Sequence, residues 1–199
     1  MSATVVKVQY ARGVARWEPN ARGRLEEAAL DLYVERGFEH TTVEEIAKRA
    51  GLTERTFFRY FADKREVLFG GSELLRDLLM GAVADAPPGS PIDAVAAALE
   101  ATGPLFEQRR KLVLRRQRVI AANPELQERE LIKMASLAGA LAGALRRRGV
   151  EEPAASLTAE AGIAAFRVAF QRWVEGPDGE LSDLIRDSLA QLKAAVAET

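Results

Sequence analysis

The sequence contains no cysteine, a single histidine and no long run of apolar residues. Without cysteine the chain can form neither disulfides nor cysteine-ligated zinc or iron–sulfur sites, which is typical of proteins in a reducing cytosol. The longest uncharged stretch of its second half, residues 134–145, has 12 residues and is rich in Gly and Ala. Because a bilayer span needs roughly 20 residues, we expect a buried helix there and a cytoplasmic protein.

The N-terminal segment lacks the apolar core of a secretory signal. Arg12 and Arg16 are not followed by an apolar run, as a signal peptide requires. The arginines also lack helical spacing, so we interpret residues 1–18 as a flexible basic arm. A tail or a short strand without function is the alternative.

The usual signatures of catalysis are missing as well. The sequence has no Gly-x-Ser-x-Gly, no Walker loop, no His-x-x-x-His and no dinucleotide-binding glycine pattern. Its one histidine, His40, falls in a predicted loop. We therefore expect neither an enzyme nor a bound metal or cofactor.

Charge is balanced over the whole chain but not along it. The formal net charge is −1, from 28 basic and 29 acidic residues, and this balance argues against a nucleic-acid binder. Residues 48–65, however, contain six cations and only two anions, a local excess of +4. The cations are Lys48, Arg49, Arg55, Arg59, Lys64 and Arg65. This segment could face a polyanion.

Apolar residues recur at helical spacing from Pro19 onward, and no convincing alternation follows residue 11. The pattern predicts an all-α fold of about nine helices, separated by glycine and proline breaks. The predicted helices cover residues 19–37, 41–51, 53–61, 64–85, 92–108, 110–122, 125–148, 154–175 and 180–197.

Two short helices in this series form a helix-turn-helix pattern. Thr42 and Glu45 make a capping box at the start of the first helix, and Thr53 caps the second. Gly51 and Leu52 alone separate the two helices, and glycine permits the tight turn. In such a motif the second helix enters the major groove of DNA.

Spacing divides the second helix of the motif into two faces. Phe57 and Phe61 point inward, with Leu52, toward the preceding helix. The residues left facing outward are Thr53, Glu54, Arg55, Thr56, Phe58, Arg59 and Tyr60. Arg55 is best placed to read a guanine, since a guanidinium can donate two hydrogen bonds to its O6 and N7.

Other side chains of this face suit different parts of DNA. Thr56 and Phe58 could contact a thymine methyl group. Arg59, Tyr60 and Lys64 are better placed for phosphates. For the cations, the alternative is an ordinary solvated helix face without contact to DNA. For Glu54, the alternative is that its negative charge only stabilises the N-terminus of the helix through the helix dipole.

The motif resembles the DNA-binding domain of the tetracycline-repressor (TetR) family over about residues 20–69. The residues that carry the resemblance are Thr41-Thr42-Val43-x-x-Ile46-Ala47-x-x-Ala50-Gly51-Leu52-Thr53-x-x-Thr56-Phe57-Phe58-x-Tyr60-Phe61-x-Asp63-Lys64. The resemblance implies a homodimer of all-helical subunits that binds a palindromic operator and a small effector.

The resemblance also implies individual roles. Thr42 and Lys64 would contact phosphates, and Arg59 and Tyr60 the DNA backbone. The residues implied in base or sugar contacts are Glu54, Arg55, Thr56 and Phe58. Phe58 stands where the family usually has tyrosine, so a phosphate bond from this position is replaced by a methyl or stacking contact.

Apolar stripes on the last two predicted helices indicate a dimer interface through about residues 154–175 and 180–197, with the subunit's own core as the alternative. The stripes comprise Ala161, Gly162, Ala165, Phe166, Ala169, Phe170 and Trp173, and then Leu181, Leu184, Ile185, Leu189, Leu192 and Val196.

The middle helices supply candidates for a cavity that holds a lipophilic effector. They are Phe106, Val113, Arg116, Gln117, Ile120, Met134, Leu137, Phe166, Phe170 and Trp173. A continuous helix 64–85 would transmit effector binding to the DNA-binding part.

The sequence thus predicts a basic arm at 1–18, a DNA-binding domain at 19–69 and an effector-binding and dimerisation domain at 70–199. The predicted function is that of a sequence-specific DNA-binding repressor, released from its operator by the effector. An activator, or a helical adaptor that no longer binds DNA, are the alternatives.

Overall fold

The computed structural model describes residues 20–176 and 179–197, so the predicted arm at 1–18 lies outside the described residues. Within the described ranges the chain forms ten α-helices and one 3-10 helix, η1, and no strand. The elements are α1 (Ala21–Arg36), α2 (Val43–Arg49), α3 (Glu54–Tyr60), η1 (Glu66–Phe69), α4 (Ser72–Asp85), α5 (Pro91–Glu100), α6 (Gly103–Gln108), α7 (Arg110–Ala121), α8 (Pro124–Arg147), α9 (Ala154–Glu175) and α10 (Leu181–Ala197). The predicted all-α fold class is confirmed.

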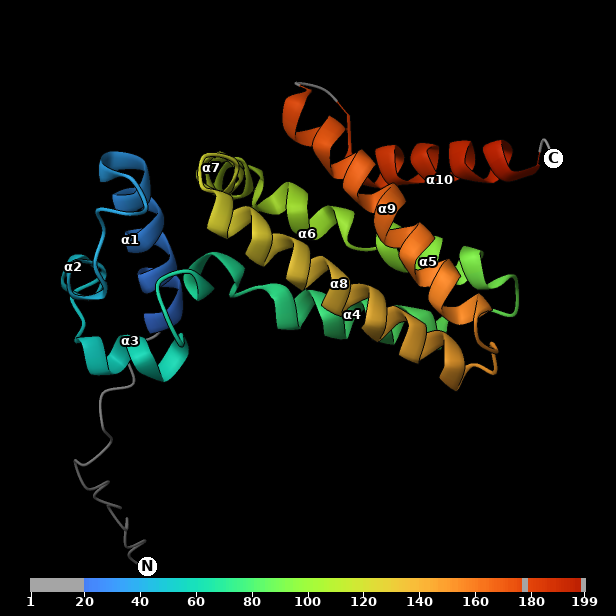
Figure 1. Cartoon of the computed structure of the whole chain (residues 1–199), viewed down its shortest axis with the longest axis horizontal. Coiled ribbons are helices and arrows are strands. Elements are labelled where there is room, and N and C mark those ends of the chain that lie inside the picture. The colour runs from blue at the N-terminus through green and yellow to red at the C-terminus, as the bar shows by residue number, and fades with distance from the viewer. Residues whose placement is uncertain (1–19, 177–178, 198–199) are drawn as a thin grey trace, which may run out of the picture.

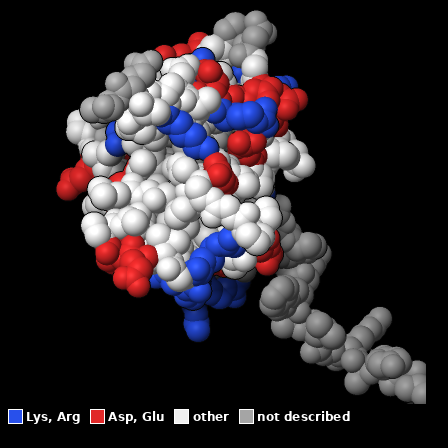
Figure 2. All heavy atoms as spheres, turned by 90° about the vertical axis from the view of Figure 1, so that its right-hand side faces the viewer, with Lys and Arg blue, Asp and Glu red and all other residues white. Residues whose placement is uncertain are grey.

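The molecule is elongated, with α1, α2 and α3 at one end (Figure 1). The opposite end shows basic and acidic side chains interspersed among uncharged ones (Figure 2). The other helices make up the remainder, where α8 packs between α4 and α9, and α10 packs on α9 and α5. Helix α7 and η1 both contact α1, so they join the two parts. Residues close to this junction therefore contact helices of both parts.

Two clusters of buried apolar side chains hold the fold together. The larger one joins α4, α5, α8, α9 and α10. The smaller one lies within α1, α2, α3 and η1, but it also includes Val119 and Ile120 of α7 and Leu126 of α8. The end formed by α1, α2 and α3 therefore shares its core with α7 and α8.

The helix predicted over 64–85 is interrupted, so the prediction of one continuous element is wrong. Asp63 accepts hydrogen bonds from the backbone N–H groups of Arg65 and Glu66, at 2.8 and 3.1 Å, and starts η1. Two glycines, which are poor helix formers, separate η1 from α4. Arg22 of α1 binds the carbonyl oxygen of the first of them, Gly70.

The helix predicted over 92–108 is also divided, into α5 and α6. Pro104 has no N–H and so cannot donate to the carbonyl of Glu100 one turn earlier. Ser182 of α10 donates to that carbonyl instead, over 3.0 Å. The side chain of Thr102 satisfies another carbonyl at the end of α5, at 2.7 Å. A tertiary contact thus replaces the lost helical bond.

Most of the apolar stripe predicted to face a second subunit lies inside this one. Ala169 and Trp173 of α9, and Leu181 and Ile185 of α10, are fully buried in the larger core. Gly162 lies so close to Val95 of α5 that a β-carbon would clash. For these residues the alternative is correct, because α5 covers the face where α9 and α10 meet.

Candidate nucleic-acid interface and effector cavity

Helices α2 and α3 and the turn between them form a helix-turn-helix with the predicted caps. The Thr42 side chain accepts from the N–H of Glu45, and Glu45 accepts from the N–H of Thr42, which completes the capping box. Gly51 adopts a φ of +67°, a conformation that glycine reaches without strain. The Thr53 side chain accepts from the N–H of Thr56 at 3.2 Å and caps α3. These local bonds fix the direction in which α3 leaves the turn.

The inner face of α3 packs into the small core. Phe57 and Phe61 are buried, and their ring centroids lie 5.5 Å apart. Ile46 and Ala47 of α2 are buried beneath them. This packing fixes the rotation of α3 about its axis and therefore decides which side chains face outward.

The outer face of α3 is solvated. Phe58 is 55% exposed and Tyr60 is 40% exposed, although both are aromatic. Glu54 and Arg55 are exposed and form no hydrogen bond or ion pair with any residue that the structure describes. Such groups remain available to an external partner.

The remaining members of the predicted face are partly engaged. Thr53 is exposed and Thr56 is half-buried, and their hydroxyl oxygens lie 3.1 Å apart. The guanidinium of Arg59 stacks on the ring of Tyr60, 4.9 Å from its centroid, and donates to its hydroxyl. Thr42 is exposed, but its hydroxyl also binds the Glu45 carboxylate at 3.1 Å.

The local positive excess counted from the sequence is smaller on this surface. Arg49 forms a bidentate ion pair with Glu35, with distances of 3.0 and 2.8 Å, and its hydrogen bonds lower the pKa of the Glu35 carboxyl. Arg65 is paired with Asp63 at 2.7 Å. Within the described ranges, the cations of this segment without a carboxylate or carbonyl partner are Lys48, Arg55 and Arg59.

Lys64 is half-buried, and its ammonium group is bonded within the protein, which argues against the phosphate contact predicted for it. Its ammonium group donates to the carbonyl oxygens of Phe38, Glu39 and Thr41, at 2.9, 3.3 and 3.1 Å. It also lies 4.3 Å from the centroid of the Phe38 ring. Because an ammonium has three protons, none is left for a phosphate. Lys64 instead holds the corner between α1 and α2.

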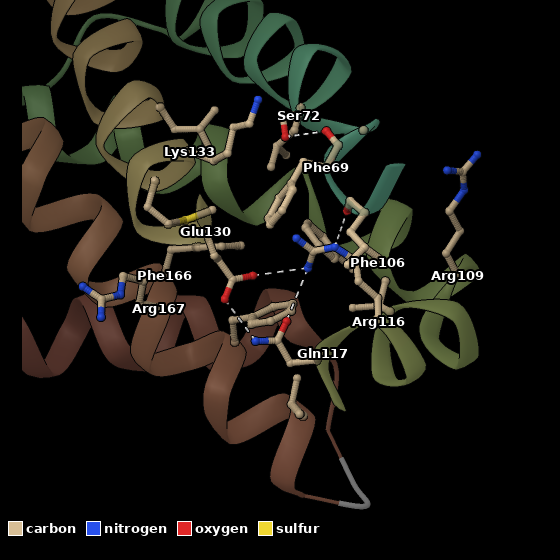
Figure 3. A pocket seen from close by; sticks show the side chains of 18 of the residues that line it. Phe69, Ser72, Phe106, Arg109, Arg116, Gln117, Glu130, Lys133, Phe166 and Arg167 are labelled. Atoms are coloured by element: carbon tan, nitrogen blue, oxygen red, sulfur yellow. Dashed lines mark hydrogen bonds and ion pairs between the residues drawn. The ribbon is translucent and has the colours of Figure 1, made fainter. Parts of the chain in front are cut away.

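A cavity of about 760 Å³ opens between the two ends of the molecule. Its wall includes residues of η1 and α1 as well as helices of the larger part, and Figure 3 shows it from close by. Apolar and aromatic side chains dominate the wall. The predicted effector-binding residues that line the cavity are Phe106, Val113, Arg116, Gln117, Met134, Leu137, Phe166 and Phe170.

Two residues predicted for the cavity do not line it. Ile120 is 1% exposed and belongs to the smaller core, which α1, α2, α3 and η1 share with α7. Trp173 is fully buried, and its indole N–H donates to Glu107 at 2.7 Å. Both lie on helices that border the cavity, but on faces that pack against other parts of the protein. Helical spacing alone did not show which apolar face of each helix borders the cavity.

Several lining residues were not predicted from the sequence. Phe69 of η1, Glu130 and Lys133 of α8, and the exposed arginines Arg109 and Arg167 border the cavity (Figure 3). A charged helical residue gives no signal in the sequence that separates a cavity wall from a solvated face. For Glu130 and Lys133, it is the packing of α8 against α7 and η1 that places the polar side in the cavity wall.

A polar cluster interrupts the apolar wall. Arg116 donates to the carbonyl oxygen of Leu68 at 2.5 Å and to the Glu130 carboxylate at 3.3 Å. Gln117 also donates to Glu130, at 3.2 Å. The guanidinium lies 5.0 Å from the centroid of the Phe69 ring. The cavity wall is thus directly bonded to η1.

Glu66 makes a second link between η1 and α8. Its carboxylate accepts from Arg129 at 2.6 Å and from Lys133 at 3.0 Å. Partial burial would raise the pKa of Glu66, but the two hydrogen-bonded cations outweigh this effect and lower it. The folded protein therefore favours the ionised form of Glu66. Its ion pairs stabilise the fold fully at pH values above the pKa that Glu66 has in the unfolded chain, and this contribution is lost as the pH falls through the lower pKa of the folded state.

We expect Glu66→Gln to lower the free energy of unfolding at pH 7 by about 1–3 kcal/mol, since it removes a partly buried ion pair. The folded-state pKa of Glu66 is lowered, so the difference from wild type should shrink as the pH falls below about 4.5. Urea denaturation between pH 7 and pH 4 measures it. Glu73→Gln is the control, because Glu73 is largely exposed. Equal losses in both variants, or a pH-independent loss, would contradict the prediction.

No group of His, Asp and Glu side chains among the described residues could hold a metal ion. His40 is exposed in the turn before α2. None of the helices in the described part is long and apolar enough to span a membrane.

The fold and the site together define a helix-turn-helix DNA-binding protein with a ligand cavity. Residues 25–69 match the family model of bacterial regulatory proteins of the TetR family, and residues 89–197 match the C-terminal domain of MftR. The chain belongs to the TetR family of transcriptional regulators. Members of this family bind DNA and small-molecule effectors and are dimers.

Two curated relatives carry regulator names. The chain is 38% identical over 81 residues to the transcriptional regulator TcmR of Streptomyces glaucescens. The matched segment is 40% of this chain but only 36% of TcmR. It is 29% identical over 136 residues to MftR of Mycobacterium tuberculosis, named for mycofactocin biosynthesis, covering 68% of this chain and 69% of MftR. These names agree with the prediction that the chain is a regulator and not an enzyme.

Solved structures show the same fold. One is the repressor FadR of Thermus thermophilus in complex with lauroyl-CoA, with a TM-score of 0.56 and 24% identity, covering 86% of this chain and 92% of FadR. At this level of identity the likeness establishes the fold alone.

Proposed function

We propose that this protein is a repressor that binds a palindromic operator as a homodimer and leaves it when a lipophilic effector fills the cavity. The observation that carries the proposal is the outer face of α3. Phe57 and Phe61 are buried in the core, while Arg55 and Glu54 are exposed and have no partner within the described residues. A helix of this kind can enter a major groove and read base edges.

The roles within this face follow from position. Arg55 reads a guanine, while Thr56 and Phe58 contact a thymine methyl group, and Glu54 accepts from a cytosine amino group. Arg59 and Tyr60 contact phosphates, with Thr42 and Thr53 at the helix starts. We divide the chain at about residue 70, between the glycines that separate η1 from α4.

Dimerisation would use the outer surfaces of α9 and α10, because their inner stripes are already buried. Leu157 and Val168 of α9 are 66% and 55% exposed, and Val196 of α10 is 69% exposed. Ala161 and Ala164 lie between the first two at helical spacing and allow a close approach of a partner helix. A two-fold dimer can present its two α3 helices about 34–36 Å apart, as successive major grooves require.

The effector class follows from the apolar and aromatic lining, which suits a lipophilic molecule. Lauroyl-CoA, bound by FadR, is a molecule with a long apolar chain. Effector binding can be coupled to DNA binding without a continuous connecting helix, because residues 67–71, next to the DNA-binding end, form part of the cavity wall. An effector that displaces η1 would move the DNA-binding end directly.

The experiment that tests this function is selection of bound fragments from a random pool of duplex DNA with the purified full-length protein. We expect a palindrome whose half-sites lie about one helical turn apart. Recovery of no enriched sequence would favour the adaptor alternative. A reporter gene placed behind the selected operator in a bacterial cell then separates a repressor from an activator by the sign of the change.

A further inference from the structure

The polar cluster of the cavity has one unused guanidinium nitrogen. Arg116 uses Nε for the carbonyl of Leu68 and Nη1 for Gln117 and Glu130. Figure 3 shows dashed lines from these two nitrogens and none from the third, Nη2. The side chain of Arg116 is 23% exposed and lines the cavity. Its free edge is therefore available to a ligand there.

This nitrogen is also accessible. In the part of the chain that the structure describes, the buried side-chain polar atoms without a partner are Arg76 Nε and Ser188 Oγ. Arg116 Nη2 is not one of them, and the centroid of the Phe69 ring in the same wall lies 5.0 Å from the guanidinium carbon. A molecule that fills the apolar space could thus place an acceptor on this nitrogen.

The charge of Arg116 is only partly compensated. Burial lowers the pKa of its guanidinium, although Glu130 acts in the opposite direction. Its bond to Glu130 is long, at 3.3 Å, and that carboxylate is shared with Gln117. Since a poorly compensated charge in an apolar site attracts a counter-ion strongly, an added anion would be favoured here.

Together with the neighbouring ion pairs, Arg116 belongs to a group of charged side chains with more positive than negative charges. Arg116, Arg129 and Lys133 supply three positive charges, whereas Glu66 and Glu130 supply two negative charges. The five side chains come from η1, α7 and α8, and they carry a net charge of +1. One negative charge on a ligand would balance this cluster.

We propose that the effector is a lipophilic carboxylate, an apolar body that ends in one acidic group, with this group bound to the Nη2 edge of Arg116. The inference rests on the proposed effector function of the cavity. The alkyl or aryl body lies among Phe106, Phe166 and Phe170. A carboxylate binds a guanidinium through two nitrogens, so its second oxygen competes with the carbonyl of Leu68 at Nε or with Glu130 at Nη1. Loss of the bond to Leu68 would loosen the contact between α7 and η1.

The test uses pairs of nearly the same shape in which a neutral amide replaces the carboxylate: dodecanoate with dodecanamide, and naphthoate with naphthamide. Isothermal titration calorimetry on the full-length protein measures their dissociation constants. We expect at least one acid to bind at least tenfold more tightly than its amide. If neither acid binds, or if each acid binds no better than its amide, the proposed ligand class is wrong.

Three variants locate the acidic group. Arg116→Gln should abolish the preference for the acid, whereas the matched control Arg167→Gln, an exposed arginine in the same wall, should retain it. Glu130→Gln should strengthen binding of the acid severalfold and leave the amide unchanged, because it removes a competing carboxylate. An unchanged preference in Arg116→Gln, or weaker acid binding in Glu130→Gln, overturns the assignment.

DNA binding by the ligand-free protein is measured separately, by fluorescence anisotropy with the selected operator. If the operator binds but the acids do not, the ligand class fails and the regulator function stands. If the operator does not bind, the proposed function fails whatever the acids do.

Discussion

Arg55→Ala is expected to weaken operator binding by about 1–3 kcal/mol for each half-site, and thus by about 30-fold or more for a dimer. The reason is that Arg55 is exposed near the start of α3 and has no partner within the described residues. The variant should also relax the base preference at one position of each half-site. Anisotropy titrations with the operator and with its single-base variants measure both effects.

Arg49→Ala is the matched control for this prediction. Arg49 lies in the same motif and is also exposed, but it is held by two hydrogen bonds to Glu35, of 3.0 and 2.8 Å. Its removal should change operator affinity only slightly. If both variants bind the operator like wild type, the outer face of α3 is not the DNA-binding surface.

Lys64→Met is expected to destabilise the folded protein by about 1.5–3 kcal/mol, the range measured for hydrogen bonds of charged groups. The substitution leaves three backbone carbonyls, those of Phe38, Glu39 and Thr41, without their shared donor. Urea denaturation measures the loss. Lys48→Met is the control, since Lys48 is exposed and has no partner in the described ranges.

The same variant distinguishes a structural lysine from a phosphate-binding one. A direct phosphate contact contributes about one unit to the slope of log affinity against log salt concentration. Because the ammonium group of Lys64 is fully engaged inside the protein, Lys64→Met should leave this slope unchanged under conditions where it is folded. A slope lower by about one unit would restore the phosphate contact that the sequence predicted.

Local sequence signals were most successful where function depends on near neighbours. The capping box of Thr42 and Glu45, the glycine turn at Gly51 and the burial of Phe57 all lie within one or two helical turns of their partners. The pattern of residues therefore predicted which side of α3 faces outward. It also predicted eight of the cavity-lining residues by type and helical position.

Charge could not be interpreted in the same way. The count of six cations in residues 48–65 included Arg49, Lys64 and Arg65, which the structure engages with Glu35, backbone carbonyls and Asp63. A charged side chain reads as solvated in a sequence whether or not it has a partner. Its partner is found only when the helices are placed in three dimensions.

Helix content, caps and the inward face of α3 were accessible from the residue pattern, because they depend on contacts three or four positions apart. Packing alone decided that η1 is separate from α4, that most of the apolar stripe of α9 and α10 is buried within the subunit, and that Arg116 binds the carbonyl of Leu68. That last bond joins residues 48 positions apart, and the bond from Arg129 to Glu66 joins residues 63 apart. Hydrophobic periodicity along the chain carries no information about contacts between residues so far apart in sequence. The link between the cavity and the DNA-binding end therefore became visible only in the tertiary structure.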